Sequence, residues 1–377
     1  MPLRKHHPLL TAELCTKPPT GSRIRRSMSL VACALLLMVG VACARGNEQS
    51  ARSIPIPVAV PTATATPLPV IVPRDDAPHG DLTEWWYYTG HLDAADGRTF
   101  GFQYVIFQAV RSDGPVGYAA HFAITDLAKG TFSYDQRSAI GAGSRTTDRF
   151  DLSVNDWWMS GANGVDKLVA SMPGYAIDIG LTSAKPIALH NGTGVISFGP
   201  AGDSYYFSRT RMPVAGNMTV DGVQIAVTGT AWMDRQWGNF VFAGGGWDWF
   251  SMHLDDQSDL TGSIVRDDLG NVILVYGTLV DPTGKTTHLT EAGFRATALD
   301  FWMSPKSGAN YPSRWRITLP DQNLDMTVSP VVLDQELDAR TSTGVIYWEG
   351  AVAVTGTREG RPLTGRGYVE LTGYAGR

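Results

Sequence analysis

The chain has 377 residues, and its 36 acidic and 31 basic side chains give a formal net charge of -5. An acidic protein offers no basic surface to a phosphate backbone, so the composition argues against nucleic acid as a partner. The three cysteines, Cys15, Cys33 and Cys43, all lie near the amino terminus, so the rest of the chain has neither disulfides nor thiolate chemistry.

Residues 1–43 are predicted to be a lipoprotein-type signal peptide. Arg23, Arg25 and Arg26 precede an apolar run that has about the length of a signal segment and is short for a membrane span. Small residues before Cys43 resemble a lipobox, in which the cysteine becomes the lipidated first residue of the mature chain. We therefore expect export and anchoring on the extracytoplasmic face of the membrane. An ordinary signal peptide, with secretion, or a signal anchor is the alternative.

Residues 44–74 form a proline-rich stretch that is predicted to be an extended linker, holding the following domain away from the membrane. A disordered tail is the alternative. Without residues 1–43 the basic residues fall from 31 to 25 and the acidic ones from 36 to 35, a net charge of -10. The remaining chain is long enough for two hydrophobic cores.

After Asp75 the composition is that of an all-β protein. Segments rich in Val, Ile, Tyr, Phe and Trp alternate or run apolar and are separated by Gly, Asp and Asn. No segment keeps a 3.6-residue period, so we expect antiparallel strands in a sandwich or barrel. The predicted strands are Thr99–Val110, Gly117–Leu127, Tyr175–Thr182, Val223–Met233, Val272–Val280, Arg314–Leu319 and Gly344–Gly356.

The stretch EWWYYTGHL, Glu84–Leu92, is bulky on both faces of the predicted strand. Such a strand needs cover on both sides, as a barrel with a filled or ligand-bearing interior would provide. Alternation places two sets of side chains on opposite faces: Trp85, Tyr87, Thr89 and His91 on one, and Glu84, Trp86, Tyr88, Gly90 and Leu92 on the other.

An internal repeat divides the mature chain. WWYYTGHL at Trp85–Leu92 returns as WDWFSMHL at Trp247–Leu254. The ends of the two modules also match, Gly229–Asp234 (GTAWMD) with Gly365–Glu370 (GRGYVE). The repeat predicts two similar barrels, at residues 75–239 and 240–377. The glycines at 244–246 lie near the junction and allow close backbone approach there.

The motifs HGDLTEWWYYTGHL, HFAITD (His121–Asp126), AWMDRQWG (Ala231–Gly238), YWEGAVAVTG and GRGYVELTGY resemble the attachment-protein-H (AttH) and carotenoid 1,2-hydratase family over nearly all of the mature chain. The resemblance implies two lipocalin-like antiparallel β-barrels in tandem and an apolar cavity for a lipophilic small molecule. Members of this family include enzymes that add water to acyclic carotenoids, cyclases, and proteins without an established activity.

Alkene hydration defines the chemistry that a catalytic site would need. The double bond must be protonated by a neutral acid in a dry pocket, and indole faces can stabilise the resulting cation. Asp234, between Trp232 and Trp237, is the predicted acid, with Trp237 beside the cation. The alternative is a structural ion pair of Asp234 with Arg235. Glu370, its repeat counterpart, sits beside Leu371 and Thr372 and is expected to lack the tryptophan partner.

One departure from the hydratase pattern concerns proton transfer. The resemblance places a histidine of the hydratases at Arg235, and a downstream tyrosine and aspartate at Tyr276 and Thr278. Arginine stays charged and cannot shuttle a proton, so this departure counts against the hydratase reaction and not against the fold.

Three histidines lie in predicted strands. His91 and His253 are repeat-equivalent, which favours a structural role, whereas His121 has no evident counterpart and is the predicted third catalytic residue. Glu84 is either a second acid facing the cavity or a hydrogen-bond partner of the backbone. The predicted ligand-binding residues are Glu84, Trp86, Tyr88, Trp232, Arg235 and Tyr276.

Several other chemistries lack their motifs. The sequence has no GxSxG, HExxH or CxxC pattern, and Gly192–Gly194 lacks the third glycine of a dinucleotide site. We therefore expect neither metal nor cofactor. Two functions remain: an enzyme that hydrates or cyclises an isoprenoid-like or polyketide-like lipid, or a lipocalin-like carrier that binds a lipophile unchanged.

Overall fold

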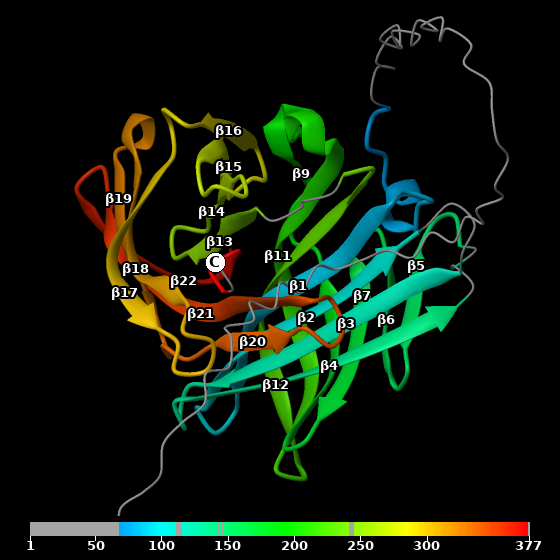
Figure 1. The fold of residues 1–377 in the computed structure, drawn as a ribbon. Coiled ribbons are helices and arrows are strands. Elements are labelled where there is room, and N and C mark those ends of the chain that lie inside the picture. Colours follow the sequence, from blue (N-terminus) through cyan, green and yellow to red (C-terminus); the bar gives the residue numbers. More distant parts are fainter. Residues whose placement is uncertain (1–67, 111–114, 142–143, 145, 241–244, 376–377) are drawn as a thin grey trace, which may run out of the picture. The chain divides into compact units, whose positions relative to one another are not determined.

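The computed structural model describes residues 68–110, 115–141, 144, 146–240 and 245–375 (Figure 1). The predicted signal peptide, the lipidation site Cys43 and most of the linker lie outside these residues. The described chain consists of strands and four three-residue 3-10 turns, which confirms the all-β prediction. None of the helices in these ranges has the length and hydropathy that a membrane crossing requires.

Two antiparallel sheets account for the fold. The first contains β1 (Thr83–Ala94), β2 (Thr99–Ala109), β3 (Val116–Asp126), β4 (Thr131–Gly141), β5 (Phe150–Val154), β6 (Trp157–Ala162), β7 (Val165–Met172), β8 (Tyr175–Thr182), β9 (Ala188–Leu189), β10 (Val195–Ser197), β11 (Asp203–Val220) and β12 (Val223–Gly238). Its strand order is β4-β3-β2-β1-β12-β11-β8-β7-β6-β5, and β9 and β10 pair with β11.

The second sheet contains β13 (Gly246–Leu254), β14 (Asp259–Arg266), β15 (Val272–Val280), β16 (Thr286–Thr290), β17 (Arg295–Met303), β18 (Asn310–Leu319), β19 (Leu324–Pro330), β20 (Glu336–Ala339), β21 (Val345–Arg358) and β22 (Arg361–Thr372). Its order is β16-β15-β14-β13-β22-β21-β19-β18-β17, and β20 pairs with β21. The 3-10 turns are η1 (Arg74–Asp76), η2 (His190–Gly192), η3 (Gly199–Ala201) and η4 (Pro320–Gln322).

Each sheet curls around its own apolar core. In the first, the Trp157 ring of β6 packs across the interior against Tyr104 of β2 and Phe122 of β3, with ring centres 6.0 and 5.8 Å apart. In the second, Phe250 of β13 contacts Trp315 of β18 at 5.7 Å. Two tandem barrels therefore form, as predicted, and buried side chains fill their interiors.

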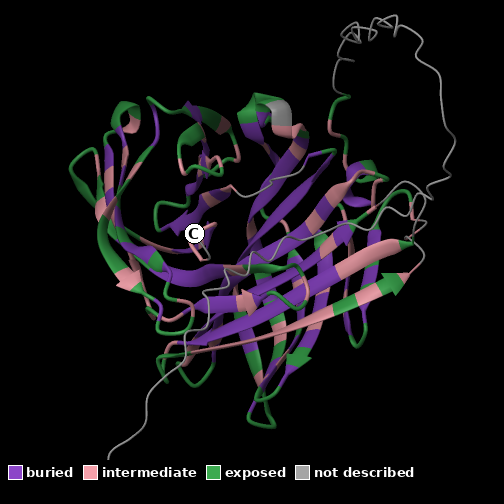
Figure 2. Cartoon of the chain, in the orientation of Figure 1, coloured by how far each residue is buried: buried purple, intermediate pink, exposed green. Residues whose placement is uncertain are grey.

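Strand β1 is buried along almost its whole length (Figure 2). Trp86, Tyr88 and Leu92 point into the core of the first barrel, whereas Tyr87 packs against residues of the second. The predicted alternation and the predicted cover on both faces are confirmed, and the second barrel supplies the outer cover.

The contact zone between β1, β2 and β12 of the first barrel and β13, β21 and β22 of the second is here termed the seam. Its buried apolar cluster consists of Tyr87, Val105, Trp232, Trp249, Ala351 and Tyr368. Equivalent residues of the two repeats lie in this zone. Tyr87 pairs with Asp234 in the first sheet, and Trp249, the repeat counterpart of Tyr87, pairs with Glu370 in the second. Repeat-equivalent side chains from both barrels thus face each other.

The end of the predicted linker belongs to the first barrel. Val70 and Val72 pack against its core, and the amide of Leu68 donates a hydrogen bond of 3.1 Å to the Tyr205 hydroxyl. The predicted close approach at the junction glycines is confirmed for the two described ones. A Cβ on Gly245 would collide with the Arg266 carbonyl oxygen, and one on Gly246 with that of Thr372.

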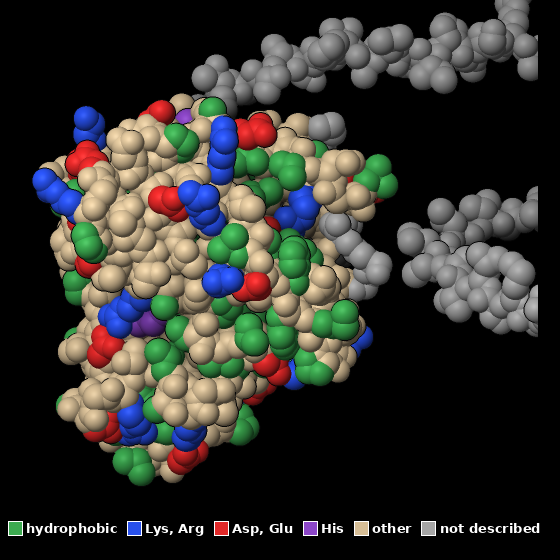
Figure 3. Space-filling view, turned by 90° about the vertical axis from the view of Figure 1, so that its left-hand side faces the viewer, with side chains coloured by type: hydrophobic (Ala, Val, Ile, Leu, Met, Phe, Trp, Pro, Cys, Tyr) green, Lys and Arg blue, Asp and Glu red, His purple; other side chains and the backbone are tan. Residues whose placement is uncertain are grey.

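The charged surface is built of mixed pairs. On the face shown in Figure 3, Lys and Arg side chains lie beside Asp and Glu. Exposed pairs such as Arg314 with Asp300, at 2.6 Å, and Lys306 with Asp334, at 2.9 Å, are of this kind. Each contributes about 0–1 kcal/mol to stability, so the fold depends on its cores and on buried pairs.

Close packing in the seam is testable at Gly101 of β2. A Cβ there would lie 2.5 Å from the Tyr368 hydroxyl oxygen and 2.8 Å from the Ala351 Cβ. Overpacking of this kind costs about 1–3 kcal/mol, so Gly101→Ala should lower the free energy of unfolding in urea by that amount. Gly117→Ala on β3, where the nearest atom is 3.8 Å away, is the control. Equal losses in both variants would contradict the close contact.

Candidate functional site

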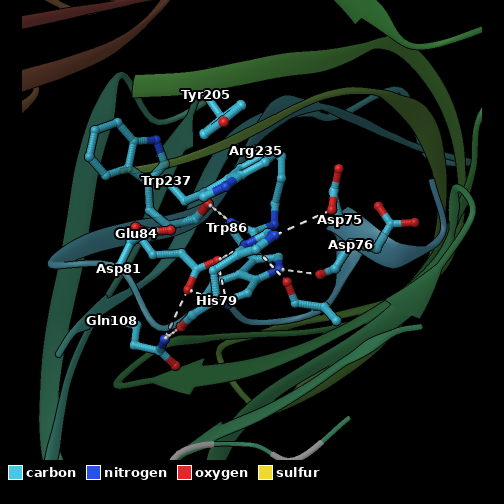
Figure 4. A network of polar contacts seen from close by, with 12 residues as sticks. Asp75, Asp76, His79, Asp81, Glu84, Trp86, Gln108, Tyr205, Arg235 and Trp237 are labelled. Atoms are coloured by element: carbon cyan, nitrogen blue, oxygen red, sulfur yellow. Dashed lines mark hydrogen bonds and ion pairs between the residues drawn. The ribbon is translucent and has the colours of Figure 1, made fainter. Parts of the chain in front are cut away.

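Two polar clusters contain most of the predicted site residues. The first lies inside the first barrel, around Arg235 (Figure 4). The guanidinium carbon of this residue lies 3.9 Å from the ring centre of Trp86 and 5.1 Å from that of Trp237. The same side chain forms a buried ion pair with Glu84 and donates a 2.7 Å hydrogen bond to the Ala77 carbonyl. Arg235 therefore joins β1 and β12 to the segment before β1.

His79 extends this cluster toward the surface. Its ring stacks on Trp237 with centres 4.3 Å apart, Nδ1 lies 2.7 Å from Glu84 Oε1, and Nε2 lies 3.4 Å from Asp75 Oδ1. Burial alone would lower the pKa of His79, but the bonds to Asp75 and Glu84 outweigh it and raise the pKa above its ordinary value. The cluster is an ion-paired closure of the first barrel.

The His79 imidazole makes this closure sensitive to pH. Because its folded-state pKa is raised, its contribution to stability is complete below the unfolded value of about 6.5 and is lost as the pH rises through the folded value. The variant His79→Gln cannot be protonated. The difference in unfolding free energy between wild type and this variant should therefore shrink as the pH rises above the unfolded pKa of about 6.5. A constant or growing difference in urea titrations would contradict this assignment.

The structure separates Asp234 from Trp237. Successive residues of a strand point to opposite faces, so Arg235 and Trp237 face the barrel interior while Asp234 faces the seam. The alternative ion pair of Asp234 with Arg235 is wrong, because Arg235 pairs with Glu84. Of the two roles expected for Glu84, the structure shows the bond to the backbone: its carboxylate accepts a hydrogen bond of 2.9 Å from the His79 amide. Tyr88 also points into the barrel, toward Asp166 at 3.0 Å.

The second cluster lies in the seam and is centred on Asp234. Its carboxylate accepts hydrogen bonds from the Tyr206 hydroxyl at 2.6 Å, from the Trp232 indole at 2.6 Å, and from the Ser208 hydroxyl. The Trp249 indole of the second barrel donates to Tyr206 at 3.0 Å. Burial raises the pKa of Asp234 to about 6 in spite of these donors. The predicted residues Asp234 and Trp232 are thus in direct contact.

Two glutamates of the second barrel complete this cluster. Glu349 of β21 is fully buried, accepts the Tyr87 hydroxyl at 2.8 Å on Oε1, and has no hydrogen-bond partner on Oε2 among the described residues. Glu370 of β22 accepts the Trp247 indole at 3.1 Å. The expectation that Glu370 lacks a tryptophan is therefore wrong, since the indole comes from the neighbouring strand β13.

The three carboxyl groups interact electrostatically. Burial, and then the charges of Glu370 and Asp234, raise the pKa of Glu349 well above its ordinary value. Burial also raises the pKa of Glu370 to about 7, and the charge of Asp234 adds to this shift. At neutral pH the seam therefore holds protonated carboxylic acid in an aromatic environment.

Glu349 is the residue that sequence reasoning missed. It lies in the motif YWEGAVAVTG, two positions from Tyr347 and Ala351, which also face the seam. The period of two along β21 places these three side chains on one face. The signal was therefore present, but the repeat aligned only Glu370 with Asp234.

His121 also reaches the seam. Its Nδ1 lies 2.7 Å from the Tyr347 hydroxyl and its Nε2 2.9 Å from the Ser342 hydroxyl. Burial lowers its pKa to about 3, so the ring is neutral. The strand register shows a repeat counterpart of His121 that the sequence did not. In the first barrel Tyr87 pairs with Val105, which pairs with His121. In the second barrel Trp249 pairs with Ser263, which pairs with Tyr276. The predicted residue Tyr276 is its repeat equivalent and is likewise buried.

His91 and His253 flank the seam in equivalent positions. His91 contacts Tyr368 with ring centres 5.7 Å apart. His253 contacts Trp232, the repeat counterpart of Tyr368, with ring centres 6.0 Å apart. Burial lowers their pKa values to about 3 and about 4. Both rings are uncharged at neutral pH.

The hollows at the surface of the described chain include the following two. One of about 290 Å³ is lined by Tyr118 and Leu152, and one of about 620 Å³ by Leu68 and Val195. Neither is lined by a predicted site residue. No three His, Cys, Asp or Glu side chains of the described ranges are arranged to hold a metal ion.

Comparison with known proteins agrees with this architecture. The family model described as AttH-like matches residues 63–374. The chain belongs to this AttH-like family.

Relatives of this AttH-like chain include one with an enzyme name. It is 26% identical over 312 residues to kievitone hydratase of Fusarium solani subsp. phaseoli, covering 76% of this chain and 81% of the relative. A putative AttH from Nitrosomonas europaea has a solved structure with a TM-score of 0.74 and 34% identity, over 82% of this chain and 98% of that one. The kievitone hydratase structure from Nectria haematococca has a TM-score of 0.65 at 19% identity, over 81% and 93% of the two chains, and supports the fold.

Proposed function

We propose that this AttH-like protein is a hydratase-like enzyme that adds water to a carbon–carbon double bond of an isoprenoid-like lipophile, without a cofactor, in the seam between its barrels. The observation that carries the proposal is the buried acid Glu349, whose Oε2 has no partner among the described residues. The hydratase name of a relative that covers 76% of this chain supports the same reaction class.

Glu349 is the proton donor in this mechanism. A neutral carboxylic acid needs a free oxygen to deliver its proton, and Oε2 of Glu349 meets this condition. Asp234 is less suited to the donor role assigned from sequence, because three donors occupy its two oxygens and favour its charged form. Its negative charge instead stabilises a cation formed beside Trp232 and Trp249.

The proposed reaction has two steps. The electron pair of the double bond takes the Glu349 proton, which leaves a tertiary carbocation and the Glu349 carboxylate. A water molecule then adds to the cation, and the carboxylate of Glu370 takes the proton that this water loses, giving a tertiary alcohol. A pKa of about 7 suits Glu370 to accept a proton near neutrality. Proton transfer from Glu370 to Glu349 restores the starting state.

The seam and not the first-barrel cluster is proposed as the site, because Arg235 and Glu84 satisfy each other. Arg235, where this chain departs from the hydratase pattern, is then not one of the reacting groups. The role of Arg235 is to hold Trp86 and Trp237 in the barrel wall.

The test is turnover of a prenylated phenol, which carries a trisubstituted double bond, in ¹⁸O-labelled water. We expect a tertiary alcohol with one labelled oxygen, detected by mass spectrometry. Asp234→Asn should lower turnover while the prenylphenol still binds. Recovery of bound but unchanged prenylphenol would indicate a lipocalin-like carrier, and absence of both binding and product would contradict both functions.

We also propose that the protein is exported and held at the membrane by lipid on Cys43. The support is the apolar segment and the lipobox-like sequence before this cysteine. Cys43→Ser should move the protein from the membrane fraction to the soluble extracytoplasmic fraction, and an unchanged membrane fraction would contradict lipid anchoring at this residue.

A further inference from the structure

We infer that the seam is also a recognition site for lipophilic organic cations, with tertiary or quaternary ammonium groups as its ligand class. The inference deepens the proposed function, because such an ion has the charge and shape of the carbocation in the proposed reaction. The carboxyl groups, the aromatic rings and the unpartnered polar atoms of the seam favour a cationic ligand whether or not the protein hydrates an alkene.

The carboxyl groups of the seam lack a cationic partner. Within the described ranges, the donors bonded to Asp234, Glu349 and Glu370 are tyrosine, serine and tryptophan side chains, all uncharged. Several other buried acids have cationic partners, with pairs of Asp76 and Arg209 at 2.8 Å, Asp259 and Arg211 at 2.6 Å, and Asp248 and Arg266 at 2.7 Å. Asp166 and Glu336 are each bonded to hydroxyl groups instead, but the seam brings three such acids together. The seam therefore concentrates negative charge, once its acids ionise, that the protein itself does not neutralise.

Aromatic rings pack beside the same carboxyl groups. Trp249 lies edge-on to Tyr87 with centres 5.3 Å apart and edge-on to Trp232 at 6.4 Å. Tyr368 belongs to the same cluster. Ring faces attract cations through their quadrupole, and aromatic cages of this composition recognise quaternary ammonium groups.

Unpartnered polar atoms provide a second, separate sign of a ligand. Glu349 is fully buried, and no described residue bonds to its Oε2. Gln103 of β2 is 1% exposed, points into the seam toward Tyr347, and has an Oε1 without a partner in the described chain. The Gln103 oxygen accepts hydrogen bonds, and so does Glu349 Oε2 once that acid is ionised, so the two atoms favour a ligand that is positively charged or donates hydrogen bonds.

The arginines whose charges act on His91 and His253 do not fill this role. Arg366 is held by both oxygens of Asp93 at 3.0 and 2.8 Å, and Arg211 is bound to Asp259. Trp85, Trp247 and Glu370 are only partly buried, so we place the entry of the ligand at this edge of the seam.

The test compares a charged ligand with its neutral carbon analogue. Benzyltrimethylammonium and neopentylbenzene have nearly the same shape, and binding of each to the full chain can be followed by quenching of tryptophan fluorescence and by calorimetry. We expect the cation to bind at least about tenfold more tightly than the neutral analogue. Glu349→Gln should reduce this preference about five- to tenfold and leave neopentylbenzene binding unchanged.

The control is Asp166→Asn, a change at a buried acid inside the first barrel, which should leave the preference for the cation as in wild type. Trp249→Phe should weaken cation binding without unfolding the chain, as checked by thermal melting. Equal affinities for the two ligands, or a preference that survives both Glu349→Gln and Glu370→Gln, would overturn the inference. Cation binding without alkene hydration would contradict the proposed function alone, and hydration without a preference for the cation would contradict this inference alone.

Discussion

Glu349→Gln is expected to lower kcat/KM for hydration of a prenylated phenol by about 10²–10⁴-fold, the usual contribution of a positioned general acid. Glutamine has nearly the same shape and can still accept the Tyr87 hydroxyl through its amide oxygen, but it has no proton acidic enough for an alkene. Because Oε2 has no partner in the described chain, replacing it with an amide nitrogen breaks no hydrogen bond among those residues. The measurement is initial rate against substrate concentration for the purified variant.

Two comparisons make this result specific. Asp166→Asn changes a buried acid that does not face the seam and should keep wild-type kcat/KM. Glu370→Gln should lower the rate and also remove the dependence of the rate on a group titrating near pH 7, because the pKa of Glu370 is about 7. Wild-type activity in Glu349→Gln would show that another group protonates the substrate, and Asp234 would then be the next candidate.

The tandem fold could be predicted because the alternation within each strand and the repeat between the two modules are both visible in short stretches of sequence. Period-two alternation in Glu84–Leu92 defines two faces, and the recurrence at Trp247–Leu254 defines two modules, so strands and barrels follow without knowledge of long-range contacts. Strand β15 begins and ends at the predicted residues Val272 and Val280. The role of the outer face was harder to predict, since its cover comes from the other module.

The composition of the site could be predicted only in part for the same reason. The sequence placed Asp234 beside Trp237, but neighbours along a strand lie on opposite faces, and the partners of Asp234 are Trp232, two positions away, and Tyr206 from another strand. Glu349 enters the site through the packing of one barrel on the other. A motif shows which residues are close in sequence, whereas the contact between modules decides which carboxyl groups share one dry space.

Arg235→Leu is expected to lower the free energy of unfolding by about 3–5 kcal/mol, the usual effect of leaving a buried charge without its partner. The side chains of Arg235 and Glu84 are both fully buried, and the guanidinium also covers the Trp86 ring at 3.9 Å. Leucine keeps apolar contact with this ring, but among the described residues it leaves the Glu84 carboxylate with His79 and Gln108 as its only hydrogen-bond partners. Urea denaturation at neutral pH measures the loss.

The double variant Glu84→Gln/Arg235→Leu separates loss of charge pairing from loss of packing. Removing both charges should recover a large part of the lost stability, because no uncompensated carboxylate remains in the barrel. Arg316→Leu, which breaks the exposed pair with Asp325, should cost at most about 1 kcal/mol. A double variant no more stable than Arg235→Leu would mean that the cation over Trp86, and not the pairing with Glu84, holds β1 and β12 to the segment that closes the first barrel.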